Sequence, residues 1–177
     1  MQYTFQTDYN QKSLAVMAKC LRKTVRAKHS KRSHIFGWIV IALALLLSFS
    51  SGDEGFTITF KAVITWIVAA VMLIVLLFED PINGHFAKKR MLKGTERANS
   101  TFDTENPEKF ISETEVGKTE FSYDKIAMIA ETERYFVFVF SASHAQVYDK
   151  NTLAGGTVNE FREFITQRTG KMIMPVK

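Results

Sequence analysis

The chain has 177 residues, of which 46% are hydrophobic and 23% charged, with one cysteine and three prolines. This composition excludes a disordered chain, a proline-rich linker, an intramolecular disulfide framework and a zinc cluster built on cysteines. The net charge of +5 is divided unevenly, since residues 1–98 carry +8 and residues 99–177 carry −3. The basic residues flank two hydrophobic blocks, which is typical of a membrane protein and argues against nucleic acid as a partner.

The first 32 residues are expected to form a cytoplasmic segment. Its first ten residues alternate enough for one short strand, which can add to the sheet of a later domain. Residues 11–32 place apolar side chains on one helical stripe and basic side chains around it, which predicts a basic amphipathic helix leading into the first hydrophobic block. This helix can lie in the inner membrane interface or pack on the later domain, and both alternatives are open.

Three side chains in and just after this segment invite a chemical interpretation. Cys20 has basic neighbours, which favour its thiolate, so it is either a palmitoylation site near the membrane or a small filler residue. His29 and His34 lie five residues apart, which fits one helix face poorly, and no third ligand is near. We therefore expect no metal site here.

Two apolar runs predict a transmembrane hairpin over residues 33–80. The first span is expected at about residues 34–51, within a stretch of 20 residues that holds no charged side chain, and the second at about residues 60–78. Twenty helical residues extend roughly 30 Å, the thickness of a bilayer hydrocarbon core. Lys61 lies near an end of the second span, where its amine can snorkel to the headgroups.

The loops around the spans predict their orientation. Eight basic residues precede the first span and five follow the second, whereas the connecting loop at residues 51–59 holds two acidic residues and no basic one. Because positive residues stay on the cytoplasmic side, both termini should be cytoplasmic and the loop should lie outside. A connection this short makes the two helices antiparallel neighbours.

Alternating runs after Arg97 predict a domain of antiparallel strands over residues 98–177. In the strongest strand, Phe136, Phe138 and Phe140 point to one face while other apolar residues point to the opposite face. This strand should therefore be central, with both faces covered. Strands are expected near residues 100–103, 109–114, 118–123, 126–132, 134–141 and 144–149, with Gly117 in a tight turn.

A helix is expected to close the domain. Thr157 and Glu160 form a capping box at its start, Phe161 lies on its apolar stripe, and Gly170 is placed to end it. The glycine pair at residues 155–156 either makes the turn into this helix or holds an anion at its N-terminus. A small curved sheet has open ends, and an amphipathic helix can plug one, as in a pleckstrin-homology-like (PH-like) split barrel. The expected fold class is thus an α+β membrane protein, with a two-helix transmembrane hairpin followed by a small antiparallel β PH-like domain and a C-terminal helix.

Several short motifs between Ser122 and Ile165 resemble one protein family. They are Tyr123-Asp124-Lys125-Ile126, Glu131-Thr132, the aromatic strand from Tyr135, Asp149-Lys150 and Glu160-Phe161-Arg162. With them, the segment resembles the C-terminal domain of the YcxB-like family of small bacterial membrane proteins. Many relatives carry Trp where Tyr123 stands, and an aromatic residue after the Asp149-Lys150 pair where Leu153 lies nearest. Both departures keep the apolar character.

The resemblance implies a bacterial PH-like domain on a membrane hairpin, in a multi-pass protein of the cell membrane. The function of the family is largely uncharacterised. A similar architecture is seen in the sublancin immunity protein, which protects a producer cell from its own peptide bacteriocin. By this analogy, the resemblance implies a protective, immunity-like role.

Three functions compete at this point. One is a non-enzymatic, membrane-anchored binding protein that protects against a membrane-active peptide or regulates a membrane partner, and another is an accessory subunit of a transporter or secretion complex. The third is an enzyme, but the sequence shows no catalytic, cofactor-binding or metal-ligating pattern. Expected partners are the lipid bilayer and a membrane protein or peptide, and small residues in the spans also allow a homo-oligomer. The candidate structural or interaction residues are Phe136, Phe138, Phe140, Thr157, Glu160, Phe161 and Lys61.

Overall fold

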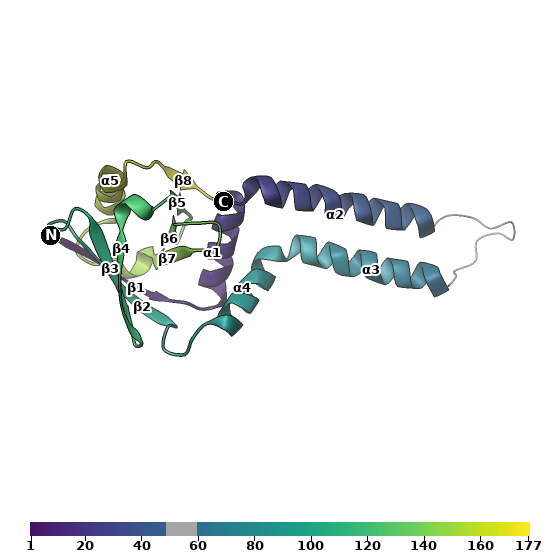
Figure 1. Cartoon of the computed structure of the whole chain (residues 1–177), viewed down its shortest axis with the longest axis horizontal. Coiled ribbons are helices and arrows are strands. Elements are labelled where there is room, and N and C mark those ends of the chain that lie inside the picture. Colours follow the sequence, from purple (N-terminus) through teal and green to yellow (C-terminus); the bar gives the residue numbers. More distant parts are fainter. Residues whose placement is uncertain (49–59) are drawn as a thin grey trace, which may run out of the picture.

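The computed structural model describes residues 1–48 and 60–177, except for the side chains of Leu47, Phe60 and Lys61. The connecting loop of the expected hairpin and the snorkelling of Lys61 therefore lie outside the described residues. The described part has a β domain at one end and a pair of long helices that projects from it (Figure 1). It is a mixed α+β structure with five α-helices and two four-stranded sheets.

The first sheet is antiparallel throughout and has the strand order β1-β2-β3-β4. Its strands are β1 (Gln2–Asp8), β2 (Arg97–Asp103), β3 (Lys109–Thr114) and β4 (Gly117–Ser122). The strand expected in the first ten residues is confirmed, and it pairs with β2 from Gln2↔Asp103 to Asp8↔Arg97. This sheet therefore takes one edge strand from the N-terminus of the chain and its other three strands from residues 97–122.

The second sheet has the order β7-β6-β5-β8. Its strands are β5 (Met128–Glu131), β6 (Tyr135–Val139), β7 (Ala145–Asp149) and β8 (Ile173–Pro175). β6 is an interior strand and all five of its residues are buried, which confirms the central strand with two covered faces. β8, which pairs in parallel with β5, was not expected, because three residues are too few to show an alternating pattern.

Each face of β6 contributes to a different core. Phe136 and Phe138 lie between the two sheets among aromatic rings, together with Phe161. Val137 and Val139 face the other way and pack with residues of the N-terminal helix. Burying a side chain of this size stabilises the fold by about 1.5–3 kcal/mol, so the two cores together hold β6 in place.

The N-terminal helix packs on the domain. It is α1 (Gln11–Lys23), which breaks at Thr24, and a second helix, α2 (Ala27–Ser48), follows. Of the two placements left open by the sequence, the structure has the one on the sheet, because Leu21 and Cys20 are buried against the second core. Burial raises the pKa of the Cys20 thiol to about 11, against the weaker influence of the nearby lysines. The expectation of a favoured thiolate is therefore wrong, and Cys20 is a filler residue.

Two long helices form the projecting hairpin. α2 runs outwards and α3 (Phe60–Leu77) returns beside it (Figure 1). α3 is followed by α4 (Glu79–Arg90), a helix that the sequence did not lead us to expect. Within the described residues no single helix has the length and hydropathy of a membrane span. One pair of helices meets both criteria when the two are taken together: Ala62–Leu77 and Glu79–Arg90, with a bend of 78° between them.

The domain closes with α5 (Val158–Thr169), and two short 3-10 helices, η1 (Tyr123–Lys125) and η2 (Lys150–Thr152), lie in its connections. The expected capping box is confirmed, since Thr157 Oγ1 accepts from the Glu160 amide at 3.3 Å and Glu160 Oε2 accepts from the Thr157 amide at 2.6 Å. Gly170 ends the helix with a φ of 62°. Gly155 has a φ of 89°, and a Cβ there would lie 1.9 Å from the Gln2 carbonyl oxygen, so the turn itself requires glycine.

Candidate functional site

Residues that carry the family resemblance meet around one carboxylate, although they are distant in sequence. Glu131, at the end of β5, accepts a hydrogen bond from Lys150 Nζ at 2.5 Å and from Arg162 Nη2 at 2.8 Å. Lys150 also donates to the Thr132 carbonyl at 2.6 Å and lies 4.9 Å from the centre of the Phe136 ring. We refer to Glu131, Lys150 and Arg162 as the Glu131 cluster.

The Glu131 cluster holds elements together. Partial burial would raise the pKa of Glu131, but the hydrogen bonds from Arg162 and Lys150 outweigh it, and the pKa is lowered. The carboxylate therefore stays ionised and joins β5 to α5 and to the end of β7. Since each of its oxygens accepts a hydrogen bond from a protein donor, the cluster is a structural network.

The candidate residues from the sequence do not form one surface site. Phe136, Phe138 and Phe161 are fully buried between the sheets. Thr157 and Glu160 occupy the helix cap described above. Phe140, also among the candidates, is half-buried at the end of β6 and lies near the rings of Phe121 and His144, with centroids 5.3 and 5.2 Å away.

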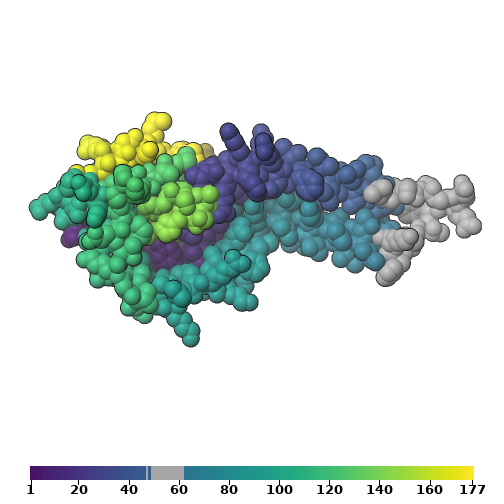
Figure 2. Space-filling model, viewed as in Figure 1, coloured from purple at the N-terminus to yellow at the C-terminus, as the bar shows by residue number. Residues whose placement is uncertain are grey.

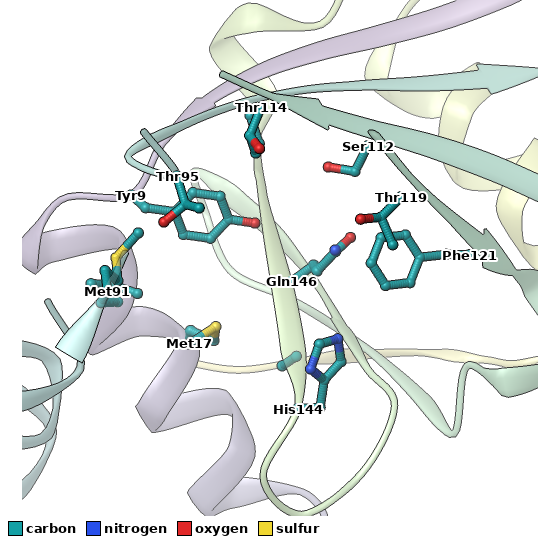
Figure 3. A pocket seen from close by; sticks show the side chains of 13 residues that line it. Tyr9, Met17, Met91, Thr95, Ser112, Thr114, Thr119, Phe121, His144 and Gln146 are labelled. Atoms are coloured by element: carbon teal, nitrogen blue, oxygen red, sulfur yellow. The ribbon is translucent and has the colours of Figure 1, made fainter. Parts of the chain in front are cut away.

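An apolar pocket of about 350 Å³ opens next to these last rings (Figure 3). Its walls come from α1, from the residues that follow α4, from the inner sides of β2 to β4, and from the start of β7. Met17 and Met91 lie at one side, and Phe121 and His144 at the other. The pocket therefore lies at the seam between the two sheets, on the side of the domain where α1 and α4 pack.

Several polar groups around the pocket have protein partners. The Ser112 hydroxyl accepts from Ser100 at 3.1 Å, and Gln146 Oε1 accepts from the Tyr148 hydroxyl at 2.5 Å. Tyr9 has a pKa raised to about 12, because burial outweighs its hydrogen bond to the backbone of Val147. What remains available to a ligand is mainly thioether, methyl and aromatic surface, so the pocket suits an apolar group.

The sequence did not reveal this pocket. Its lining comes from five separate parts of the chain, and no short motif marks them. In the sequence, His144 lies in a short polar break between two apolar runs, and no motif surrounds it. In the structure the ring of His144 lies 6.1 Å from that of Phe121 with an angle of 27° between the planes, and 5.2 Å from the ring of Phe140, so the ring has aromatic neighbours.

A second charged cluster lies where the hairpin meets the domain. Arg22 of α1 donates to both oxygens of Asp80 at 2.8 and 2.6 Å, and His34 of α2 lies 2.8 Å from Glu79. The hydrogen bond from Arg22 to Asp80 raises the pKa of Arg22, and this effect outweighs partial burial, which lowers it. This cluster joins α1, α2 and the start of α4 at the bend after α3.

Comparison with protein-family models gives a match for part of the chain. The family model described as YcxB-like protein matches residues 106–165, from just before β3 to within α5. No curated protein and no solved structure matches the chain. The matched segment contains the whole Glu131 cluster and the β3, β4 and β7 walls of the pocket. The YcxB-like family, which the motifs of the sequence resemble, is therefore the family that this chain matches over residues 106–165.

Proposed function

We propose that this chain is a non-enzymatic binding protein anchored in a bacterial cell membrane. In this proposal α2 and α3 form a transmembrane hairpin, both termini are cytoplasmic, and the two sheets with α5 form a PH-like domain at the inner face. The apolar pocket takes an apolar group of a membrane protein or of a membrane-active peptide.

The observation that carries this proposal is the apolar surface of the hairpin. Phe36 and Leu46 of α2 are 65% and 68% exposed, and Ile67 of α3 is 57% exposed. Each such side chain gains about 1.5–3 kcal/mol on leaving water, and soluble monomers rarely expose continuous apolar patches of this kind. The hairpin extends well beyond the domain (Figure 2), so the domain does not cover this surface.

Charges lie where a membrane hairpin needs them. No Asp, Glu, Lys or Arg occurs from Ser33 to Ser48 or from Ala62 to Phe78. The charged cluster of Arg22, His34, Glu79 and Asp80 is confined to the base of the hairpin. Lys88, Lys89, Arg90 and Lys93 follow on the same side, which supports a cytoplasmic domain.

The packing within the hairpin bears on the alternative function. A Cβ at Gly37 would lie 2.9 Å from Leu76 Cδ1, and Ala69 is buried. These small residues are thus used between the two helices, and they do not by themselves indicate a further helix of a larger complex. An accessory subunit of a transporter or secretion complex remains the second candidate, and it should purify in mild detergent with a stoichiometric large partner.

Cysteine labelling tests the topology. With Cys20 replaced by alanine, a cysteine at Gly55 should react with an impermeant thiol reagent in intact cells, and one at the exposed Asn151 should not. The opposite pattern would overturn the proposed orientation. Extraction of the whole protein by alkaline carbonate would overturn the membrane hairpin itself.

Gene deletion tests the protective function. We expect the deletion to sensitise cells to a particular membrane-active peptide while growth is otherwise normal. Replacing both spans with an unrelated hairpin of equal length should abolish protection while the domain stays folded. If the deletion changes sensitivity to none of the peptides tested, the accessory-subunit function takes precedence.

A further inference from the structure

We infer that the outward face of α4 is a lipid-binding surface that lies on the anionic inner leaflet and sets the orientation of the domain against the bilayer. The inference rests on the membrane hairpin proposed above and goes beyond it, because a hairpin alone leaves the domain free to tilt. It also places the interfacial contact on α4, a helix absent from the sequence-based expectations, and not on α1.

The face has the composition of an interfacial helix. Phe78, Ile82 and Phe86 follow one another at intervals of four, so they share one side of the helix. Phe78 and Phe86 are 53% and 52% exposed, and all three line one apolar hollow with Pro81, His85 and, from α1, Gln11. Phe78 directly follows the last residue of α3, so this surface continues that of the proposed span.

The opposite side of α4 is fixed to the domain. Gly84 is buried, and a Cβ there would lie 2.8 Å from the backbone nitrogen of Ala15 in α1. Asp80 of α4 forms an ion pair with Arg22, which also belongs to α1. The exposed phenylalanines are therefore presented by a helix that already has its protein partner, and no further part of the described chain covers them.

The bend gives α4 the right direction. Its axis is turned by 78° from that of Ala62–Leu77, so a span close to the membrane normal leaves α4 nearly parallel to the membrane plane. Figure 1 shows α4 leading away from the end of α3, next to α1. A helix in this position buries its apolar side at the level of the headgroups.

The charges identify the lipid. Lys88, Lys89 and Arg90 form the last turn of α4 and Lys93 follows; all are exposed, and none has an ion pair among the described residues. The acidic residues at the start of the helix are engaged by Arg22 and His34. Lys88 also lines a separate hollow with Glu96 and Glu115, so Lys89, Arg90 and Lys93 are the cations best placed for anionic headgroups.

Site-specific fluorescence on the full chain in vesicles tests this surface. In a Cys20→Ala background, an environment-sensitive fluorophore is attached to a cysteine at Phe86 or, as a control, at Lys118 on the exposed edge strand β4. In vesicles containing phosphatidylglycerol, the probe at 86 should be quenched by phospholipid spin-labelled near the headgroup and shielded from iodide. The probe at 118 should not be quenched by the spin-labelled lipid and should remain accessible to iodide.

Charge variants supply the second arm. Lys89→Gln with Arg90→Gln should reduce the shielding of the probe at 86 several-fold in anionic vesicles, towards its value in phosphatidylcholine. Lys118→Gln with Lys171→Gln removes two positive charges from elsewhere on the domain and should leave the shielding of the probe at 86 unchanged. Equal reduction by both pairs would overturn the specific role of α4.

The outcomes separate the inference from the function it rests on. If carbonate releases the protein from the vesicles, the membrane hairpin fails. If the protein stays inserted while the probe at 86 is as open to iodide as the probe at 118, only the lipid surface fails. Shielding from iodide without quenching by spin-labelled lipid would show that protein covers α4, as a second copy would, and also overturns the inference.

Discussion

Glu131 and Arg162 lie 31 residues apart in the sequence and are joined by two hydrogen bonds, from Nη2 to Oε1 at 2.8 Å and from Nε to Oε2 at 3.1 Å. This pair fastens α5 to the end of β5, and Lys150 binds the same carboxylate from the other side. The helix that closes the domain is thus held by its apolar stripe and by one carboxylate with two cations.

Replacing Glu131 by Gln should destabilise the domain by about 1–3 kcal/mol, because Lys150 and Arg162 lose a charged acceptor. The pKa of Glu131 is below its usual 4.5 in the folded chain, so its contribution is fully present above that value. It is lost as the pH falls through the lower folded value. Urea unfolding followed by circular dichroism should therefore show a flatter acid limb below pH 4.5 for Glu131→Gln. The exposed Glu133→Gln serves as control, and an equal effect there would contradict the assignment.

Phe138→Asp should unfold the domain. Phe138 is fully buried and lies 4.7 Å, centroid to centroid, from Tyr148, and burying an unpaired carboxylate there costs several kcal/mol. The whole chain should be used, because β1 and α1 complete the sheet and the second core. Val116→Asp, at a turn where the side chain is 61% exposed, should leave the near-ultraviolet circular dichroism intact. A folded Phe138→Asp protein would show that β6 is not central.

Tyr123→Phe should leave stability unchanged or raise it by about 1 kcal/mol. The Tyr123 hydroxyl is buried and has no hydrogen-bond partner among the described residues, and burial raises its pKa. Tyr148→Phe is the matched control, because it removes the hydrogen bond to Gln146 and should destabilise the chain. Thermal unfolding of both variants measures the difference, and a loss of stability in Tyr123→Phe would contradict this account.

Gly84→Val should weaken the contact between α1 and α4 by about 1–3 kcal/mol. The new side chain would meet the backbone of Ala15, which cannot move aside as a flexible side chain would. Asn83→Val places the same residue on an exposed position of the same helix and controls for helix propensity. Hydrogen exchange at the α1 amides should rise in Gly84→Val alone. Equal protection in both variants would mean that the helices do not cross at Gly84.

A photoreactive benzoylphenylalanine at Thr119 should form an adduct with the partner in irradiated cells, because Thr119 lines the apolar pocket. The same residue at Lys118 points to the other face of β4 and should give none. Thr119→Trp should fill the pocket and abolish protection in a complemented deletion strain, while the thermal midpoint changes little. Adducts of equal yield at both positions would remove the pocket from the binding surface.

Features that depend on neighbours along the chain were predictable from the sequence. The alternation around Phe136 and Phe138 indicated a strand with two covered faces, and Thr157 with Glu160 marked the start of α5. Two uncharged apolar runs marked the helices of the hairpin, and short motifs indicated the YcxB-like family, which matches residues 106–165. Strand alternation, capping and helix-forming runs extend over a few residues, so a single sequence displays them.

The tertiary structure decided what each of these elements packs against. The pairing of β1 with β2, which joins Asp8 to Arg97 across 89 residues, the addition of β8 to β5 and the packing of α1 on the sheet are seen only in the folded chain. These contacts join segments whose sequence patterns do not specify a partner. The same is true of the pocket and of the Glu131 cluster, whose members lie close together only after folding. An amphipathic stripe shows that a face must be covered, whereas shape and close packing, such as that of Gly84 on Ala15, decide what covers it.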